Sequence, residues 1–232
     1  MRNIFAGGST GPRGCVGMQH VQAVPLPMPG LYGVMIAVAR GLPRWGLTRE
    51  VFVWRVKNLP NLWRGAWRAI VAGIFGVPFM CATLHLRVTR ADGTIVDYGI
   101  ASLRVVTTVG AGYIVDAFQN TVEVENMKFH GIGTGTNAEN VSDTTLQTEL
   151  TTQYNPDNTR ATGSTTETSS NIYRTVGTNT VDSSAAVTEH GILSQAATGG
   201  GVLLDRSQFS VINLANGDSL QSTYDLTFNT GG

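Results

Sequence analysis

Short runs of alternating apolar and polar residues fill the chain from residue 84 onward. The first run has a period of two residues, typical of a half-buried strand, with apolar side chains at Leu84, Leu86 and Val88. Asp92-Gly93 separates this run from residues 95–98, and Asp-Gly between two such runs predicts a tight β-hairpin.

Beyond residue 159 the chain becomes a series of Thr-rich runs separated by turn residues. Further strands are predicted at 103–108, 128–132, 159–168, 171–179, 186–195, 202–211 and 219–229. In the last run an apolar set alternates with a polar set, which predicts one face on the core and one face toward solvent. This spacing predicts a mainly β protein, an antiparallel β-sandwich of about seven or eight strands.

One or two short helices are expected within the sandwich. Tyr113, Ala117 and Phe118 recur at helical spacing, which predicts a helix over residues 112–120. Ser142 has the character of a helix N-cap, and it predicts a second helix over residues 144–150.

The first eighty residues show no clear pattern and are predicted to be an irregular N-terminal extension. Residues 50–56 are the exception, because Val51, Val53 and Arg55 alternate with other apolar residues and predict a strand. The uncharged run at 69–84 is shorter than the roughly 20 residues needed to span a bilayer and contains Pro78, so no membrane contact is expected.

Charge and composition divide the chain at about the same point. Residues 1–68 carry nine basic and one acidic side chain, whereas the remainder carries seven basic and fifteen acidic ones. All four tryptophans and seven of the eight prolines lie before residue 80. We therefore expect a basic, Trp/Pro-rich extension at 1–80 and a Thr/Gly-rich sandwich domain at 81–232. The extension is either a genuine arm or a reading frame extended upstream of a true start at Met80.

No catalytic, cofactor-binding or metal-binding residue is predicted. The glycine-rich loop at 131–135 is not followed by a lysine, so it does not match a phosphate-binding loop. No serine lies in a Gly-x-Ser-x-Gly elbow. Cys15 and Cys81 suit two free thiols in a reducing cytoplasm, although a disulfide between them stays open. The histidines lack the spacing of metal ligands, although His130 could approach His190 across a sheet.

Several segments carry a resemblance to a known class of proteins. They are FHGIGTGT at 129–136, DT at 143–144, EHGI at 189–192, LLDR at 203–206, GDSL at 217–220 and YDLTF at 224–228. The pattern resembles small β-sandwich structural proteins of tailed-bacteriophage virions, several of which are capsid cement (decoration) proteins. The resemblance covers about residues 84–232.

The resemblance implies a protein that is not an enzyme and has no cofactor or small-molecule substrate. It would be assembled in the host cytoplasm into the virion, where it bridges capsomers on the shell. Its implied partners are the major capsid protein and copies of itself, in a homotrimer. A tail, neck or fibre-base component and a carbohydrate-binding virion module are the alternatives, and nucleic-acid contact by the basic extension stays open.

Overall fold

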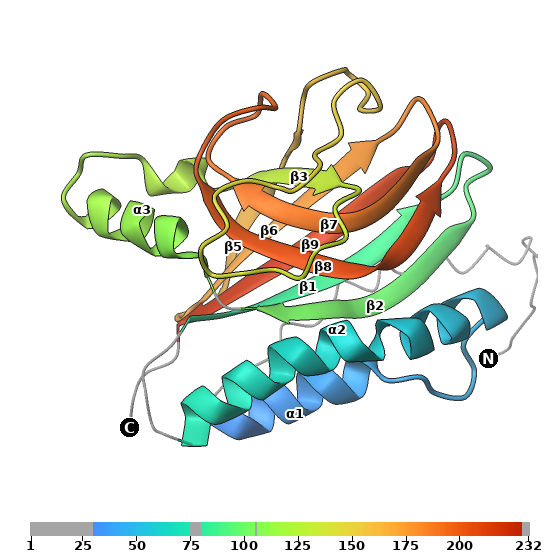
Figure 1. The fold of residues 1–232 in the computed structure, drawn as a ribbon, viewed down its shortest axis with the longest axis horizontal. Helices are drawn as coiled ribbons and strands as arrows, with labels where there is room; N and C mark the ends of the chain where they lie inside the picture. The colour runs from blue at the N-terminus through green and yellow to red at the C-terminus, as the bar shows by residue number, and fades with distance from the viewer. Residues whose placement is uncertain (1–29, 75–79, 105, 229–232) are drawn as a thin grey trace, which may run out of the picture.

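A computed structural model describes residues 30–74, 80–104 and 106–228 (Figure 1). The described strands are β1 (Met80–Thr89), β2 (Ile95–Arg104), β3 (Phe129–Gly133), β4 (Ala161–Thr162), β5 (Ser164–Ser169), β6 (Ile172–Thr180), β7 (Ala185–Leu193), β8 (Leu203–Leu214) and β9 (Ser219–Phe228). They form a five-stranded sheet in the order β2-β1-β9-β6-β5 and a four-stranded sheet in the order β4-β3-β7-β8. All strand pairs are antiparallel, so the predicted mainly β, antiparallel sandwich is confirmed.

The core lies between the two sheets, as the alternation in the first run at 84–88 and in the last run at 219–229 predicted. The inward side chains of β1 are fully buried, and they meet residues of the opposite sheet such as Ile132 and Phe209. The hairpin at Asp92-Gly93 is confirmed, because Gly93 has a φ of +84° and the Arg90 amide donates to the Thr94 carbonyl at 2.8 Å. Gly suits this position because it adopts a positive φ without a steric penalty.

Two strand predictions need correction. Residues 103–104 complete β2 instead of starting a new strand, and the predicted strand at 159–168 is two strands, β4 and β5. Gly163 separates them where the chain passes from the four-stranded sheet to the five-stranded sheet. A Cβ at this position would lie 2.0 Å from the hydroxyl of Thr175 on β6. The second face of β9 is not open to solvent either, because Thr223, Asp225 and Thr227 on that face are buried, with Asp225 paired to Arg174.

The helices agree less well with the sequence pattern. Helix α3 (Thr108–Phe118) confirms the helix predicted at 112–120, and it begins earlier because the Thr107 hydroxyl accepts a hydrogen bond from the Gly110 amide at 3.0 Å. A single 3-10 turn, η1 (Val124–Asn126), follows it. The helix predicted at 144–150 is wrong, because these residues lie in the long loop between β3 and β4.

The described part of the extension is helical, not irregular. Helix α1 (Gly30–Gly41) packs beside α2 (Arg49–Ile74). Residues 50–56 belong to α2, so the strand predicted there is wrong. The uncharged run divides between the end of α2 and the start of β1, and residues 75–79 lie outside the described part. Among the described helices, none combines the length and the apolar character needed to cross a membrane.

Helix α2 closes one side of the sandwich (Figure 1). It lies across β2 and β8, which are the edge strands of the two sheets on that side. The Asn58 side chain donates to the Ala101 carbonyl at 2.7 Å and accepts from the Ser210 amide at 2.8 Å, so one residue binds both edges. The Trp54 indole donates to the Ser210 carbonyl at 2.8 Å and lies within the core. The change in composition near residue 80 therefore does not separate two independently packed units.

Candidate functional site

The opposite side of the sandwich ends in a bare strand, β5. Its sequence, STTETS, is polar on both faces, and residues 164–167 are exposed. β5 pairs with β6, and within the described residues no strand pairs with its outer side. An edge of this kind presents unpaired amide and carbonyl groups that another extended chain can bind.

A shallow hollow of about 210 Å³ lies at the end of this edge. Tyr173 and Phe228 supply its apolar part, and Phe228 is 40% exposed. Glu167, Ser169 and Asn171 supply polar groups beside them. The edge therefore offers backbone groups for pairing and a neighbouring hollow for a side chain of the partner.

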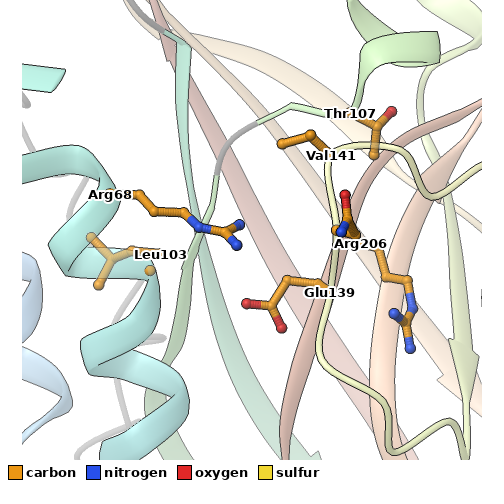
Figure 2. Close-up of a pocket in the computed structure, with 8 residues that line it drawn as sticks. Arg68, Leu103, Thr107, Glu139, Val141 and Arg206 are labelled. Carbon is orange, nitrogen blue, oxygen red and sulfur yellow. The ribbon is translucent and has the colours of Figure 1, made fainter. Parts of the chain in front are cut away.

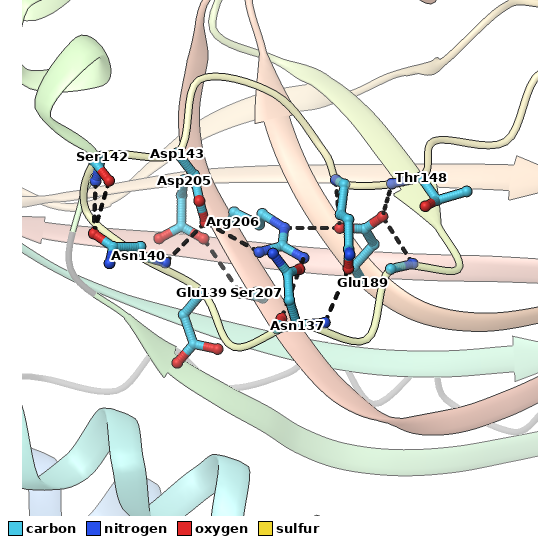
Figure 3. Close-up of polar contacts among 12 residues, drawn as sticks. Asn137, Glu139, Asn140, Ser142, Asp143, Thr148, Glu189, Asp205, Arg206 and Ser207 are labelled. Carbon is cyan, nitrogen blue, oxygen red and sulfur yellow. Dashed lines mark hydrogen bonds and ion pairs between the residues drawn. The ribbon is translucent and has the colours of Figure 1, made fainter.

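A buried ion pair holds the long β3–β4 loop onto the outer face of the four-stranded sheet (Figure 3). Glu189 of β7 is fully buried, and its Oε1 accepts from the amides of Gly135 at 3.0 Å and Thr148 at 2.7 Å. Its Oε2 accepts from the Gln147 amide at 3.0 Å and from Arg206 Nε at 2.7 Å. Each oxygen is thus bound by two donors, and the loop is tied to the sheet at three backbone positions.

The remaining guanidinium nitrogens of Arg206 extend the same network. Nη1 donates to Asp143 at 3.0 Å, and Nη2 donates to the side chain of Asn137 at 2.6 Å. A second pair fastens the far end of the loop, where Arg160 binds Glu149 through two nitrogens and donates to the Gln195 carbonyl at 2.8 Å. These carboxylates serve as structural acceptors, and their donors are fixed by packing.

His130 and His190 lie on neighbouring strands of the four-stranded sheet and are in contact, an approach across a sheet that the sequence left open, and His130 also reaches the opposite sheet. His130 Nδ1 lies 3.0 Å from His190 Nε2, and His130 Nε2 lies 3.1 Å from the hydroxyl of Thr175 on the opposite sheet. Both rings are fully buried. Burial favours the neutral imidazole and lowers the pKa of His130 to about 3, and burial with the neighbouring ring lowers the pKa of His190 well below its usual value. The pair is therefore neutral near pH 7.

A small pocket marks the point where α2 meets the β3–β4 loop (Figure 2). Its volume is about 10 Å³, which accommodates about one water molecule. Glu139 of the β3–β4 loop accepts from Arg64 Nη1 of α2 at 3.2 Å, and Figure 2 shows the Arg68 side chain directed toward Glu139. The pocket lies at the contact between the helix and the loop, and its volume is too small for a substrate.

The described residues contain no group of three or more His, Cys, Asp or Glu side chains placed to hold a metal ion. Cys81 is buried under α1 and α2, and burial raises the pKa of its thiol to about 12. Cys15 lies outside the described residues, so the possible disulfide between Cys15 and Cys81 stays untested.

Comparison with known proteins adds no relative from which a role could be transferred. No family model, no curated protein and no solved structure matches this chain. The candidate site therefore depends on geometry. Sequence reasoning placed β5 within a strand but missed that it is an edge, and the signal available was the polar character of both of its faces.

Proposed function

We propose that this chain is a structural protein of a tailed-phage virion, and that it acts as a capsid cement protein bridging neighbouring capsomers. The observation that carries the proposal is the difference between the two sides of the sandwich, of which one is covered and the other is exposed. One side is closed by α2, and the other presents the exposed β5 edge. The resemblance of residues 129–136 and 189–228 to virion sandwich proteins supports the same role.

The mechanism is strand addition to β5. An extended segment of the major capsid protein would pair with the outer side of β5 and place a side chain in the hollow beside Tyr173 and Phe228. The backbone pairs supply affinity, and the hollow supplies specificity. The Glu189–Arg206 network and the histidine pair keep the sandwich rigid, which lets it transmit load between capsomers.

The extension has a part in this proposal. Trp54 lies in the sandwich core and Asn58 binds both sheet edges, so we propose that residues 30–74 belong to the working protein. By covering β2 and β8, the helix leaves β5 as the side through which the sandwich pairs with the shell.

Binding to expanded empty shells, assembled from the major capsid protein encoded with this chain, tests the proposal. The full chain should co-sediment with the shells and raise their disruption temperature. Thr166→Lys, on the exposed edge, should weaken binding, because edge lysines oppose strand pairing. Thr152→Lys is the matched control, since Thr152 is exposed in the β3–β4 loop away from the edge.

Absence of binding, with no gain in shell stability, would contradict the cement role. A tail, neck or fibre-base component, or a carbohydrate-binding module, should leave shells unbound and bind purified tails or glycans instead. Equal loss of binding in Thr166→Lys and Thr152→Lys would reject β5 as the contact.

A further inference from the structure

An open groove lies between the start of α2 and the edge strand β8. Its volume is about 500 Å³, more than twice that of the hollow beside β5 and within the range of ligand-binding clefts. Arg49, Val53 and Lys57 line it from α2, and Ser210 and Val211 line it from β8. Val53 and Val211 are 41% and 43% exposed, so they give the groove an apolar wall on each side. We call this hollow the α2–β8 groove.

The floor of the α2–β8 groove is a fixed polar network in which Glu50 already has its partners. The Tyr98 hydroxyl donates to Glu50 Oε1 at 2.5 Å, and Arg90 Nη2 lies 2.9 Å from the same oxygen. Arg90 also binds Asp218 through Nη1 at 2.9 Å. The Trp54 ring meets the Tyr98 ring edge-on with centroids 4.9 Å apart, and the indole N–H is bound to β8. These contacts fix the floor of the groove before any ligand enters.

Two cations on the helix side of the groove have no such partner. Arg49 and Lys57 are exposed, and neither side chain forms an ion pair or hydrogen bond with another described residue. Together with Arg90 they give the lining three cations against the one carboxylate of Glu50, a net charge of +2. Val53 lies four residues from each free cation, and residues four apart lie on one side of a helix. The helix therefore presents a row of cation, apolar side chain and cation to the groove.

We infer that the α2–β8 groove binds an extended acidic peptide segment of another chain. Two carboxylates of the segment pair with Arg49 and Lys57, and an apolar side chain between them packs against Val53 and Val211. The eight-residue step from Arg49 to Lys57 spans about 12 Å of helix. Residues four apart in an extended peptide lie about 13 Å apart and on the same side. The matching motif is therefore an acid, any residue, an apolar residue, any residue and a second acid.

Other occupants fit the groove less well. Nucleic-acid bases need an exposed aromatic face for stacking, whereas Trp54 and Tyr98 are only 5% and 2% exposed. The Glu50 carboxylate also opposes a dense row of phosphates. Residues 1–29, 75–79, 105 and 229–232, which lie outside the described part, include no Asp or Glu, so their side chains cannot supply the carboxylates.

Fluorescence anisotropy of a labelled peptide, titrated with the full chain, tests the contact. The probe is a capped Ser-Glu-Ser-Leu-Ser-Glu-Ser, and the same peptide with both glutamates replaced by glutamine is the control. The acidic peptide should bind about fivefold to tenfold more tightly, because it adds two exposed ion pairs. The difference should shrink as the salt concentration rises, since salt screens exposed charges.

Neutral variants locate the contact on α2. Arg49→Gln with Lys57→Gln should abolish the preference for the acidic peptide. Arg68→Gln is the matched control, because Arg68 is exposed on the same helix but lies eleven residues beyond Lys57 and outside the groove. It should bind both peptides as the parent chain does.

A carboxylate built into the row should act as a competitor of the peptide. Val53→Glu places an acid four residues from both Arg49 and Lys57, where it can pair with each along the helix. This variant should lose the preference for the acidic peptide with its melting temperature unchanged or raised. Val53→Gln should keep the preference while binding both peptides more weakly. Arg49→Glu with Lys57→Glu should instead prefer a peptide with lysines in place of the glutamates, which loss of folding could not produce.

Equal binding of the acidic and the glutamine peptides would overturn the inference, as would no binding at up to about 1 mM peptide. A loss in Arg68→Gln as large as in the double variant would overturn it too. Binding of a single-stranded oligonucleotide or of anionic vesicles through Arg49 and Lys57, without peptide binding, would assign these cations to a different partner and reject the peptide.

The inference does not depend on the cement role, because the groove and the β5 edge lie on opposite sides of the sandwich. The peptide assay contains no shells. A chain that binds the peptide but not shells would refute the cement role alone, and a chain that binds shells but not the peptide would refute this inference alone.

Discussion

The replacement Glu189→Gln removes one charge from the centre of the loop network while keeping the shape of the side chain. Glu189 is fully buried and accepts four hydrogen bonds, three from loop amides and one from Arg206. A glutamine has one acceptor oxygen, so its NH2 group must face two of these donors. Arg206, itself only 3% exposed, would keep Asp143 as its remaining carboxylate partner in this network.

The expected loss of stability is large. Breaking a buried ion pair from one side costs about 3–5 kcal/mol, because the other charge stays buried. A domain typically has a folding free energy of roughly 5–15 kcal/mol, so this is a substantial part of the total. For a chain of this size each kcal/mol lowers Tm by about 2–4 °C, and we expect Glu189→Gln to lower Tm by roughly 10 °C.

Chemical denaturation and calorimetry of the purified chain would measure the change. Glu125→Gln is the matched control, because Glu125 is exposed on the turn after α3 and the substitution is the same. Hydrogen exchange should accelerate at the amides of Gly135, Gln147 and Thr148 in Glu189→Gln. A loss within about 1 kcal/mol of the control, with these amides still protected, would refute the reasoning, since a typical neutral hydrogen bond already contributes that much.

Three further predictions concern other buried polar groups. The folded state keeps His130 and His190 neutral while the unfolded chain binds protons below pH about 6.5, so stability is complete above that pH and falls below it. For His130 the loss is about 1.4 kcal/mol per pH unit until its folded pKa of about 3, and denaturation midpoints at pH 7 and 5 should show a slope that His130→Gln reduces. Asn58→Ala should cost about 1–3 kcal/mol, since two backbone groups at sheet edges lose their partner, and unchanged unfolding would contradict the role of α2 in closing that side. In a Cys15→Ser background the buried Cys81 should resist a thiol-specific reagent until the protein unfolds, and rapid labelling of the native chain would show that α1 and α2 do not cover it.

Much of the sandwich follows from local pattern, but helix α2 does not. Its buried side includes Val51, Trp54, Arg55 and Asn58, at successive intervals of three, one and three residues. Two of these are polar because they bind carbonyl and amide groups at the sheet edges, so the apolar period of a helix is interrupted. Residues 50–56 (EVFVWRV) are rich in β-branched and aromatic side chains, which favours a strand. A partner that lies 43 or 152 residues away leaves no local signal.

The helix prediction for residues 144–150 failed for a related reason. Ser142 and Asp143 have the character of a helix start, but the amides of Gln147 and Thr148 bind Glu189 on β7 instead of forming helical bonds. Asp143 itself binds Arg206. The edge position of β5 had a weak local signal, the polar character of both faces of STTETS, but a strand sequence does not by itself say whether its sheet continues beyond it.

The position of β9 sets the order in which this molecule can form. β9 is the last described strand in the chain, yet it lies at the centre of the five-stranded sheet, paired along its length with β1 and β6. Until the residues of β9 have been synthesised, the described strands of that sheet can pair only as two separate hairpins, β1–β2 and β5–β6. Folding is therefore a late event with many long-range contacts, which makes it slow and leaves Trp54, a core residue of the folded protein, exposed on the nascent chain. Expression at low temperature or with chaperones present should raise the yield of folded protein.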